Sequence, residues 1–221
     1  MGTTKVGVIL SGCGVKDGSE IHEAVFTLLE IARNGAEAVC MAPDTTSAVV
    51  DHLKGEATGE KRNALIEAAR IARGRIRDLR QVRAADLDAI IVPGGLGAAS
   101  VLCDFAAKGR DCAAHPEVER ILLEMHGAGK PIGAICIAPA LLASIFGRKG
   151  APIQITIGSD AGTAAKLESM GVRHANRGVR EICVDSANKI VTTPAYMLAE
   201  TIDQTADGIA LLVKEVVRLA P

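Results

Sequence analysis

Short apolar segments alternate with helix-like segments along most of this 221-residue chain. The clearest apolar segments are residues 5–10, 37–41, 87–92 and 132–135, and glycine, proline or a stretch of helical periodicity follows them. Short strands that are apolar on both faces are typical of parallel sheets covered by helices on both sides. The alternation therefore predicts β-α-β units and an α/β fold around one mostly parallel sheet.

The first helix is predicted to begin near the capping pair Asp17 and Glu20 and to end at Gly35. Its expected buried face is an apolar stripe at helical spacing, formed by Ile21, Val25, Leu28 and Ala32. The chain has no internal repeat and no long linker, and its length suits one well-buried α/β domain. We therefore expect a single domain over residues 1–221.

Composition argues against several classes of function. The net charge is −1 with acids and bases interspersed, and the aromatic residues are only three Phe and one Tyr, so we expect no nucleic-acid partner. No apolar stretch reaches the roughly 18 residues of a membrane span, and no secretory signal precedes the first strand. The six cysteines show no C-x-x-C pair or zinc-like spacing, which predicts reduced thiols, no metal and a cytoplasmic location.

The segment around Cys136 carries the strongest functional signal. The apolar strand 132–135 runs directly into Cys136, and an Ala/Leu-rich helix begins immediately after it. A side chain at such a junction projects from the carboxyl edge of the sheet, where the positive end of the helix favours a thiolate. Other α/β enzymes use this junction as a nucleophile elbow, in which the next N–H stabilises an oxyanion. The competing interpretation is a buried structural cysteine.

Two other strand ends are expected to meet Cys136 at the same edge of the sheet. One leads to Glu20, His22 and Glu23 at the start of the first helix, and the other ends in Gly94 and Gly95, whose backbone can approach a ligand closely. A thiol, a carboxylate and backbone donors are the groups needed for thiol addition to a carbonyl. The alternative interpretation for each glutamate is a purely structural role as a helix cap. We interpret all five histidines as surface or capping residues, and no cofactor motif is present.

Several motifs together resemble the PfpI-type superfamily: residues 87–95 (LDAIIVPGG) followed by residues 132–142 (IGAICIAPALL). Within that superfamily, residues 7–15, 17–24 and 191–199 are similar to the ElbB subgroup, which was once linked to isoprenoid synthesis. The resemblance covers nearly the whole chain. It implies one PfpI-type domain with a flavodoxin-like three-layer sandwich of the class I glutamine amidotransferase-like type, and a homodimer.

The resemblance also implies roles for individual residues. It makes Cys136 the elbow nucleophile and requires a buried glutamate hydrogen-bonded to it, which we assign to Glu23 from its distance to Gly35. Because Glu23 lies nearly opposite the expected apolar stripe, Glu20 stays a second candidate. The positions that match the oxyanion hole are Gly95 and Ile137, and those that match a pocket-lining loop are Thr193 and Pro194.

The activity implied by the ElbB resemblance is that of a cofactor-independent glyoxalase, a lyase that converts the small dicarbonyl glyoxal to glycolate through a hemithioacetal on Cys136. Ile137 stands where proteases and amidotransferases of this architecture carry histidine, so a glutamine amidotransferase-like hydrolase would lack an acid for the amine leaving group. A different hypothesis is a non-enzymatic stress or interaction protein with Cys136 as its redox sensor.

Overall fold

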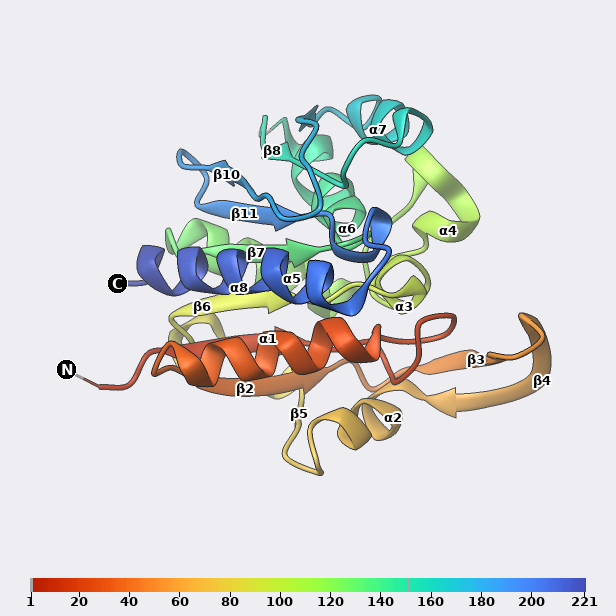
Figure 1. The fold of residues 1–221 in the computed structure, drawn as a ribbon. Helices are drawn as coiled ribbons and strands as arrows, with labels where there is room; N and C mark the ends of the chain where they lie inside the picture. The colour runs from red at the N-terminus through yellow and green to blue at the C-terminus, as the bar shows by residue number, and fades with distance from the viewer. Residues whose placement is uncertain (1, 151) are drawn as a thin grey trace.

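The computed structural model describes residues 2–150 and 152–221, and a seven-stranded sheet forms its centre (Figure 1). The strands of this sheet are, in chain order, β1 (Lys5–Ile9), β2 (Glu37–Ala42), β5 (Arg77–Asp78), β6 (Ala89–Val92), β7 (Ile132–Ile135), β10 (Cys183–Asp185) and β11 (Ile190–Thr193). Their spatial order is β10-β11-β7-β6-β1-β2-β5, and every neighbouring pair is parallel except β10 and β11. The predicted mostly parallel sheet is therefore confirmed.

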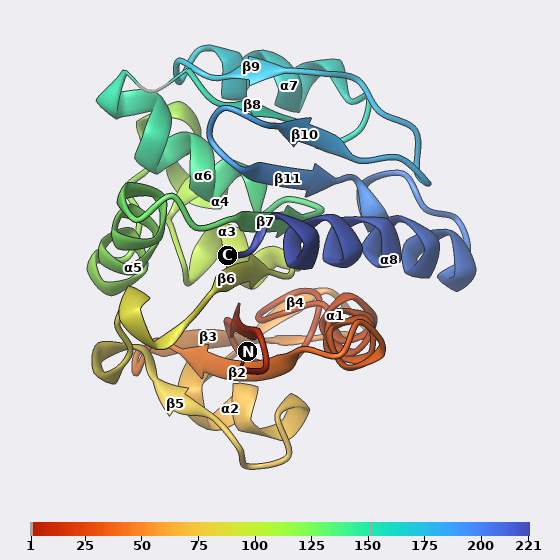
Figure 2. The same ribbon diagram turned by 90° about the vertical axis from the view of Figure 1, so that its left-hand side faces the viewer.

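Helices cover both faces of the sheet, as Figure 2 shows most clearly. The helices are α1 (Ile21–Arg33), α2 (Ala64–Ile71), α3 (Leu96–Ser100), α4 (Phe105–Lys108), α5 (Pro116–Gly127), α6 (Pro139–Phe146), α7 (Ala161–Glu168) and α8 (Ile202–Leu219). One apolar core lies between the sheet and α3, α4, α5 and α6, and a second lies between the sheet and α1, α2 and α8. Two cores around one sheet make the predicted three-layer sandwich. No helix in the described ranges is both long and apolar enough to cross a bilayer.

Two small sheets lie outside the central one. Strands β3 (Thr46–Asp51) and β4 (Glu56–Asn63) form an antiparallel hairpin that extends past the carboxyl edge of the large sheet (Figure 1). Strands β8 (Gln154–Ile155) and β9 (Arg173–His174) pair with each other. The strand β4 is mostly polar and almost wholly exposed, so the sequence has no apolar alternation there that would predict it.

The buried face of α1 differs from the predicted stripe. Ile21 and Val25 are 44% and 46% exposed. The buried side chains of α1 are Glu23, Ala24, Thr27 and Ile31. Helix α1 packs against α8 and the sheet, and this contact rather than the apolar spacing decides which face is buried. The stripe prediction was wrong, and Glu23 lies on the buried face.

An apolar row remains uncovered on the single chain. Ile21, Val25 and Leu29 follow one another at four-residue spacing along α1, and each is more than 40% exposed. Exposed apolar side chains at helical spacing are a feature of protein–protein interfaces. The homodimer implied by the sequence resemblance stays a prediction, which light scattering of the purified chain can test.

Candidate active site

Cys136 lies on a sharp turn between β7 and α6. Its φ is 60°, in the left-handed region that residues with a side chain rarely adopt. The turn is held from outside, because the Cys136 N–H donates to the Thr193 carbonyl at the end of β11, at 3.0 Å. The backbone N–H groups of Gly95 and Ile137 hydrogen-bond to the sulfur. The two positions predicted for the oxyanion hole thus converge on the thiol.

Glu23 is the carboxyl group beside that thiol. Its side chain is fully buried and hydrogen-bonds to Cys136. One carboxyl oxygen accepts from the Gly94 N–H at 2.8 Å, and the other accepts from the Tyr196 N–H at 3.4 Å. Glu20, the second candidate, instead caps α1, since its Oε2 accepts from the Glu23 N–H at 2.7 Å. The thiol–carboxyl pair is therefore Cys136 with Glu23.

Gly94 and Gly95 allow the strand ends to meet this closely. A Cβ added at Gly94 would lie 2.5 Å from Cys136 Cβ and 2.6 Å from Glu23 Oε2. A Cβ added at Gly95 would collide with backbone atoms of Gly18 and Glu20, and the φ of Gly95 is 90°. Both glycines therefore act by leaving room for the pair and for its backbone donors.

We expect Gly94→Ala to lower the free energy of unfolding by about 2 kcal/mol, because the added methyl must displace Glu23 or Cys136. Urea denaturation measures this loss. Gly127→Ala is the matched control: Gly127 ends α5, and among the described residues no atom beyond its chain neighbours and its own helix backbone lies within 4 Å of its added Cβ. A Gly94→Ala protein as stable as the control would contradict the close packing described here.

Burial controls the protonation of the pair. Burial, and next the negative charge of Glu20, raise the pKa of Glu23 to about 8, although two backbone N–H bonds oppose the change. Burial, and next the charge of Glu23, also raise the pKa of Cys136 well above its ordinary value. The thiolate predicted from the helix N-terminus is thus opposed by burial, and at neutral pH both groups mostly hold their protons. Once Glu23 is protonated, its charge no longer opposes the thiolate, which makes a thiolate beside a neutral carboxylic acid the reactive state.

The loop after β11 contributes mainly backbone to the site. The Thr193 carbonyl holds the Cys136 N–H, whereas the Thr193 hydroxyl donates to the carbonyl of Glu181 at 2.9 Å and is not directed at the sulfur. Pro194 is buried and ends the strand. Ala195 follows with a φ of 43°, and the next N–H, that of Tyr196, points to Glu23. The predicted loop therefore acts through its main chain.

His22 and Tyr196 join the site although neither was predicted to do so. The Nδ1 atom of His22 lies 2.7 Å from the Tyr196 hydroxyl and 3.9 Å from Glu20 Oε1. The sequence contains one signal for His22, its place directly before Glu23. Tyr196 is 174 residues away along the chain, so only the folded sheet brings the two together.

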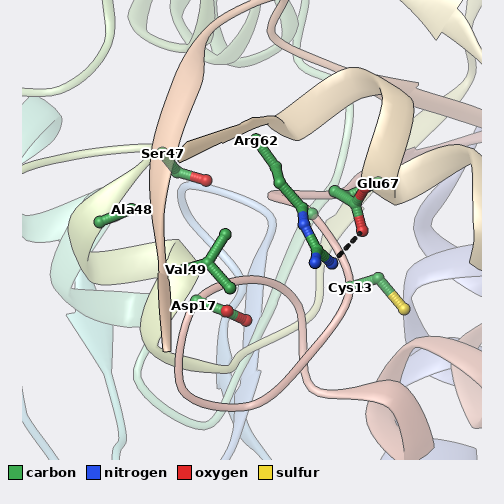
Figure 3. Close-up of a pocket in the computed structure, with 8 residues that line it drawn as sticks. Cys13, Asp17, Ser47, Ala48, Val49, Arg62 and Glu67 are labelled. Carbon is green, nitrogen blue, oxygen red and sulfur yellow. Dashed lines mark ion pairs between the residues drawn. The ribbon is translucent and has the colours of Figure 1, made fainter. Parts of the chain in front are cut away.

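A hollow lies between the loop after β1 and the β3–β4 hairpin (Figure 3). Its volume is about 30 Å³, which is room for a water molecule rather than a metabolite. Arg62 pairs with Glu67 there at 3.7 Å, and burial followed by the charge of Glu67 raises the pKa of Cys13. Within residues 2–150 and 152–221, no three His, Cys, Asp or Glu side chains group as metal ligands. The pair at Cys136 is therefore the better candidate site.

Comparison with known proteins identifies close relatives. No family model matches the chain. It is 48% identical to the rat ES1 protein homolog, mitochondrial, over 97% of this chain and 84% of the relative. It is 46% identical to the human glutamine amidotransferase-like class 1 domain-containing protein 3, mitochondrial, over 97% of this chain and 83% of the relative.

The predicted cytoplasmic location is wrong by this comparison, since the rat and human relatives and a zebrafish ES1 protein, 34% identical, are all named as mitochondrial. The prediction came from the spacing of the cysteines and from the expectation that no secretory signal precedes the first strand. Free thiols separate reducing from oxidising surroundings, but they do not distinguish one reducing compartment from another.

Solved structures support the same assignment. An isoprenoid biosynthesis protein with an amidotransferase-like domain from Ehrlichia chaffeensis has a TM-score of 0.93 and 35% identity, over 98% of this chain and 99% of that one. Glyoxalase III from Candida albicans (TM-score 0.64, 15% identity, 99% and 98% covered) and DJ-1beta from Drosophila melanogaster (0.60, 19%, 99% and 96%) share the fold. The chain thus has the predicted amidotransferase-like fold of the DJ-1/PfpI type, and it belongs to the ES1 family of glutamine amidotransferase-like class 1 proteins.

Proposed function

We propose that this protein is a cofactor-independent glyoxalase that converts glyoxal to glycolate at Cys136. One observation carries the proposal: the buried carboxyl of Glu23 hydrogen-bonds to a thiol that also receives the N–H groups of Gly95 and Ile137. A carboxyl with a pKa of about 8 can both donate and accept a proton near neutral pH. Because Cys136 is only 8% exposed, a two-carbon substrate suits the site.

In the first step the Cys136 thiol releases its proton to solvent, and the thiolate adds to one aldehyde carbon of glyoxal. The new C–S bond pushes the carbonyl π electrons onto oxygen, where the N–H groups of Gly95 and Ile137 stabilise the charge. Glu23 then gives its proton to that oxygen, which completes the hemithioacetal and leaves a carboxylate. No poor leaving group departs in this step, so the missing histidine after Cys136 is no obstacle.

The second step moves a proton between the two carbons. The Glu23 carboxylate removes the C–H proton of the hemithioacetal carbon, and the electron pair forms a C=C bond while the π electrons of the neighbouring carbonyl move to its oxygen, which gives an enediolate. Glu23 returns the proton to the second carbon, and the hydroxyl proton of the first carbon passes to the oxygen of the second, which gives a glycolyl thioester on Cys136. Water hydrolyses the thioester, which releases glycolate and restores the thiol. One carbon is oxidised and the other reduced, so no external electron acceptor is needed.

The direct test measures glyoxal consumption and glycolate formation by the purified protein without added cofactor. We expect the two to proceed in equal amounts. Loss of glyoxal without glycolate would indicate simple adduct formation on lysine and arginine and would remove the proposal.

The site also supports a second candidate function, the redox sensor. The donors around the sulfur, Glu23 and the N–H groups of Gly95 and Ile137, would hydrogen-bond an oxygen added to it. Treatment with hydrogen peroxide followed by mass spectrometry of the Cys136 peptide tests this function. Selective oxidation of Cys136 in a protein that makes no glycolate would favour the sensor over the enzyme.

A further inference from the structure

Tyr196 contacts the first turn of α1 at two points. Its backbone N–H donates to Glu23 Oε1 at 3.4 Å, and its hydroxyl lies 2.7 Å from Nδ1 of His22, the residue before Glu23. The two aromatic rings lie 5.9 Å apart between centroids. The side-chain contact therefore ties the turn that carries Tyr196 to the same stretch of helix that carries the proposed acid–base group.

The turn that carries Tyr196 is strained and needs such a tie. Ala195 has a φ of 43°, which costs a side-chain-bearing residue about 1 kcal/mol or more. The bonds within the 3₁₀ turn Ala195–Met197 and its flanks join Met197 to Pro194 and Leu198 to Ala195. These bonds shape the turn, but they do not hold it against α1.

We propose that the His22–Tyr196 hydrogen bond is a clamp that positions the Tyr196 N–H on Glu23 and thereby sets proton exchange between Glu23 and Cys136. The clamp rests on the proposed function, because it acts on the group assigned there as acid and base. His22 and Tyr196 are positioning residues, since their side chains act through Glu23. Without the clamp, Glu23 keeps the Gly94 N–H but loses the second backbone donor to its charged form.

Other groups face the clamp and must stay constant in a test. Glu20 lies 3.9 Å from His22 Nδ1 and also raises the pKa of Glu23 through its charge. Thr205 faces the Tyr196 hydroxyl from α8, and Cys136 faces Glu23 from the end of β7. Variants of His22 and Tyr196 leave these groups in place.

The test follows the pH dependence of Cys136 alkylation by iodoacetamide, quantified by mass spectrometry of the Cys136 peptide. Loss of a hydrogen bond to a carboxylate disfavours its charged form, so without the clamp Glu23 should stay neutral to a higher pH. Because the charge of Glu23 raises the pKa of Cys136, we expect Tyr196→Phe and His22→Ala to lower the midpoint of Cys136 alkylation by about half a pH unit. His22→Asn should restore the wild-type midpoint, because the amide occupies the position of Nδ1. His126→Gln is the matched control, a histidine hydrogen-bonded to Asn188 and outside this cluster.

His22 and Tyr196 are both partly exposed, so the variants are expected to fold, which circular dichroism checks. A Tyr196→Phe midpoint equal to wild type overturns the clamp, and so does failure of His22→Asn to restore a midpoint shifted by His22→Ala. A shifted midpoint in a protein that makes no glycolate supports the clamp and removes only the glyoxalase. Normal glycolate formation with unshifted midpoints removes only the clamp.

Discussion

Replacing Cys136 by serine is expected to reduce kcat/KM for glyoxal by at least about 10³-fold. A serine hydroxyl is a far weaker nucleophile than a thiolate, and no base in the site is placed to ionise it, since Glu23 is mostly protonated at neutral pH. The elbow geometry should survive, because serine differs by one atom and the backbone bond to Thr193 is unchanged. Glycolate formation measured over a range of glyoxal concentrations gives the effect.

Cys13→Ser is the matched control for this loss. Cys13 is a partly exposed thiol whose pKa is also raised by burial, but it lies in the separate hollow beside Arg62 and Glu67. We expect its turnover of glyoxal to equal that of wild type. If Cys136→Ser converts glyoxal about as fast as Cys13→Ser, the result contradicts the proposed mechanism.

Glu23→Gln is expected to have two opposite effects. Turnover should fall by about 10²- to 10⁴-fold, because glutamine can donate to sulfur but cannot carry a proton between carbons. Stability should rise, because glutamine resembles the protonated carboxyl without the cost of burying a charge. Relative to the variant, the wild-type protein should lose about 3 kcal/mol of unfolding free energy between pH 5 and pH 8.

The sign of that pH dependence follows from the raised pKa. In the unfolded chain Glu23 releases its proton near pH 4.5, whereas in the folded chain it holds the proton to about pH 8. Between these values the folded state binds the extra proton, so rising pH favours unfolding. His115 and His174 titrate in the opposite sense, because burial lowers the pKa of each, so the difference between wild type and Glu23→Gln isolates Glu23. A difference that stays constant from pH 5 to pH 8 would show that the carboxyl is ionised throughout.

Much of the fold could be predicted because the buried strands of a parallel sheet appear in the sequence as short apolar segments. The segments that became β1, β2, β6 and β7 are apolar runs, and glycine or proline follows several of them. The same local signals placed Cys136 at the elbow, and the family resemblance placed Gly95 and Ile137 beside it. The predictions failed where a contact joins segments that are distant in the sequence, or where a strand has no apolar pattern. The strand β4 is mostly polar and exposed, so no apolar alternation marks it in the sequence.

The choice between Glu20 and Glu23 shows why the site was only partly predictable. Periodicity identified a helix, but α1 has apolar residues on more than one face, and only the packing of α8 and the sheet decides which face is buried. The contact between His22 and Tyr196 depends on β11 lying beside β7, which no local pattern encodes.

The sequence by itself determined the α/β class, the strand-to-helix junction at Cys136 and the glycines that let backbone donors reach it, because these depend on periodicity and on backbone conformations set by a few neighbouring residues. Tertiary structure alone decided that Glu23 faces the thiol, that both groups keep their protons at neutral pH, and that Tyr196 reaches α1. Those properties depend on burial and on contacts between distant segments, which exist only once the sheet and its two helical layers have assembled.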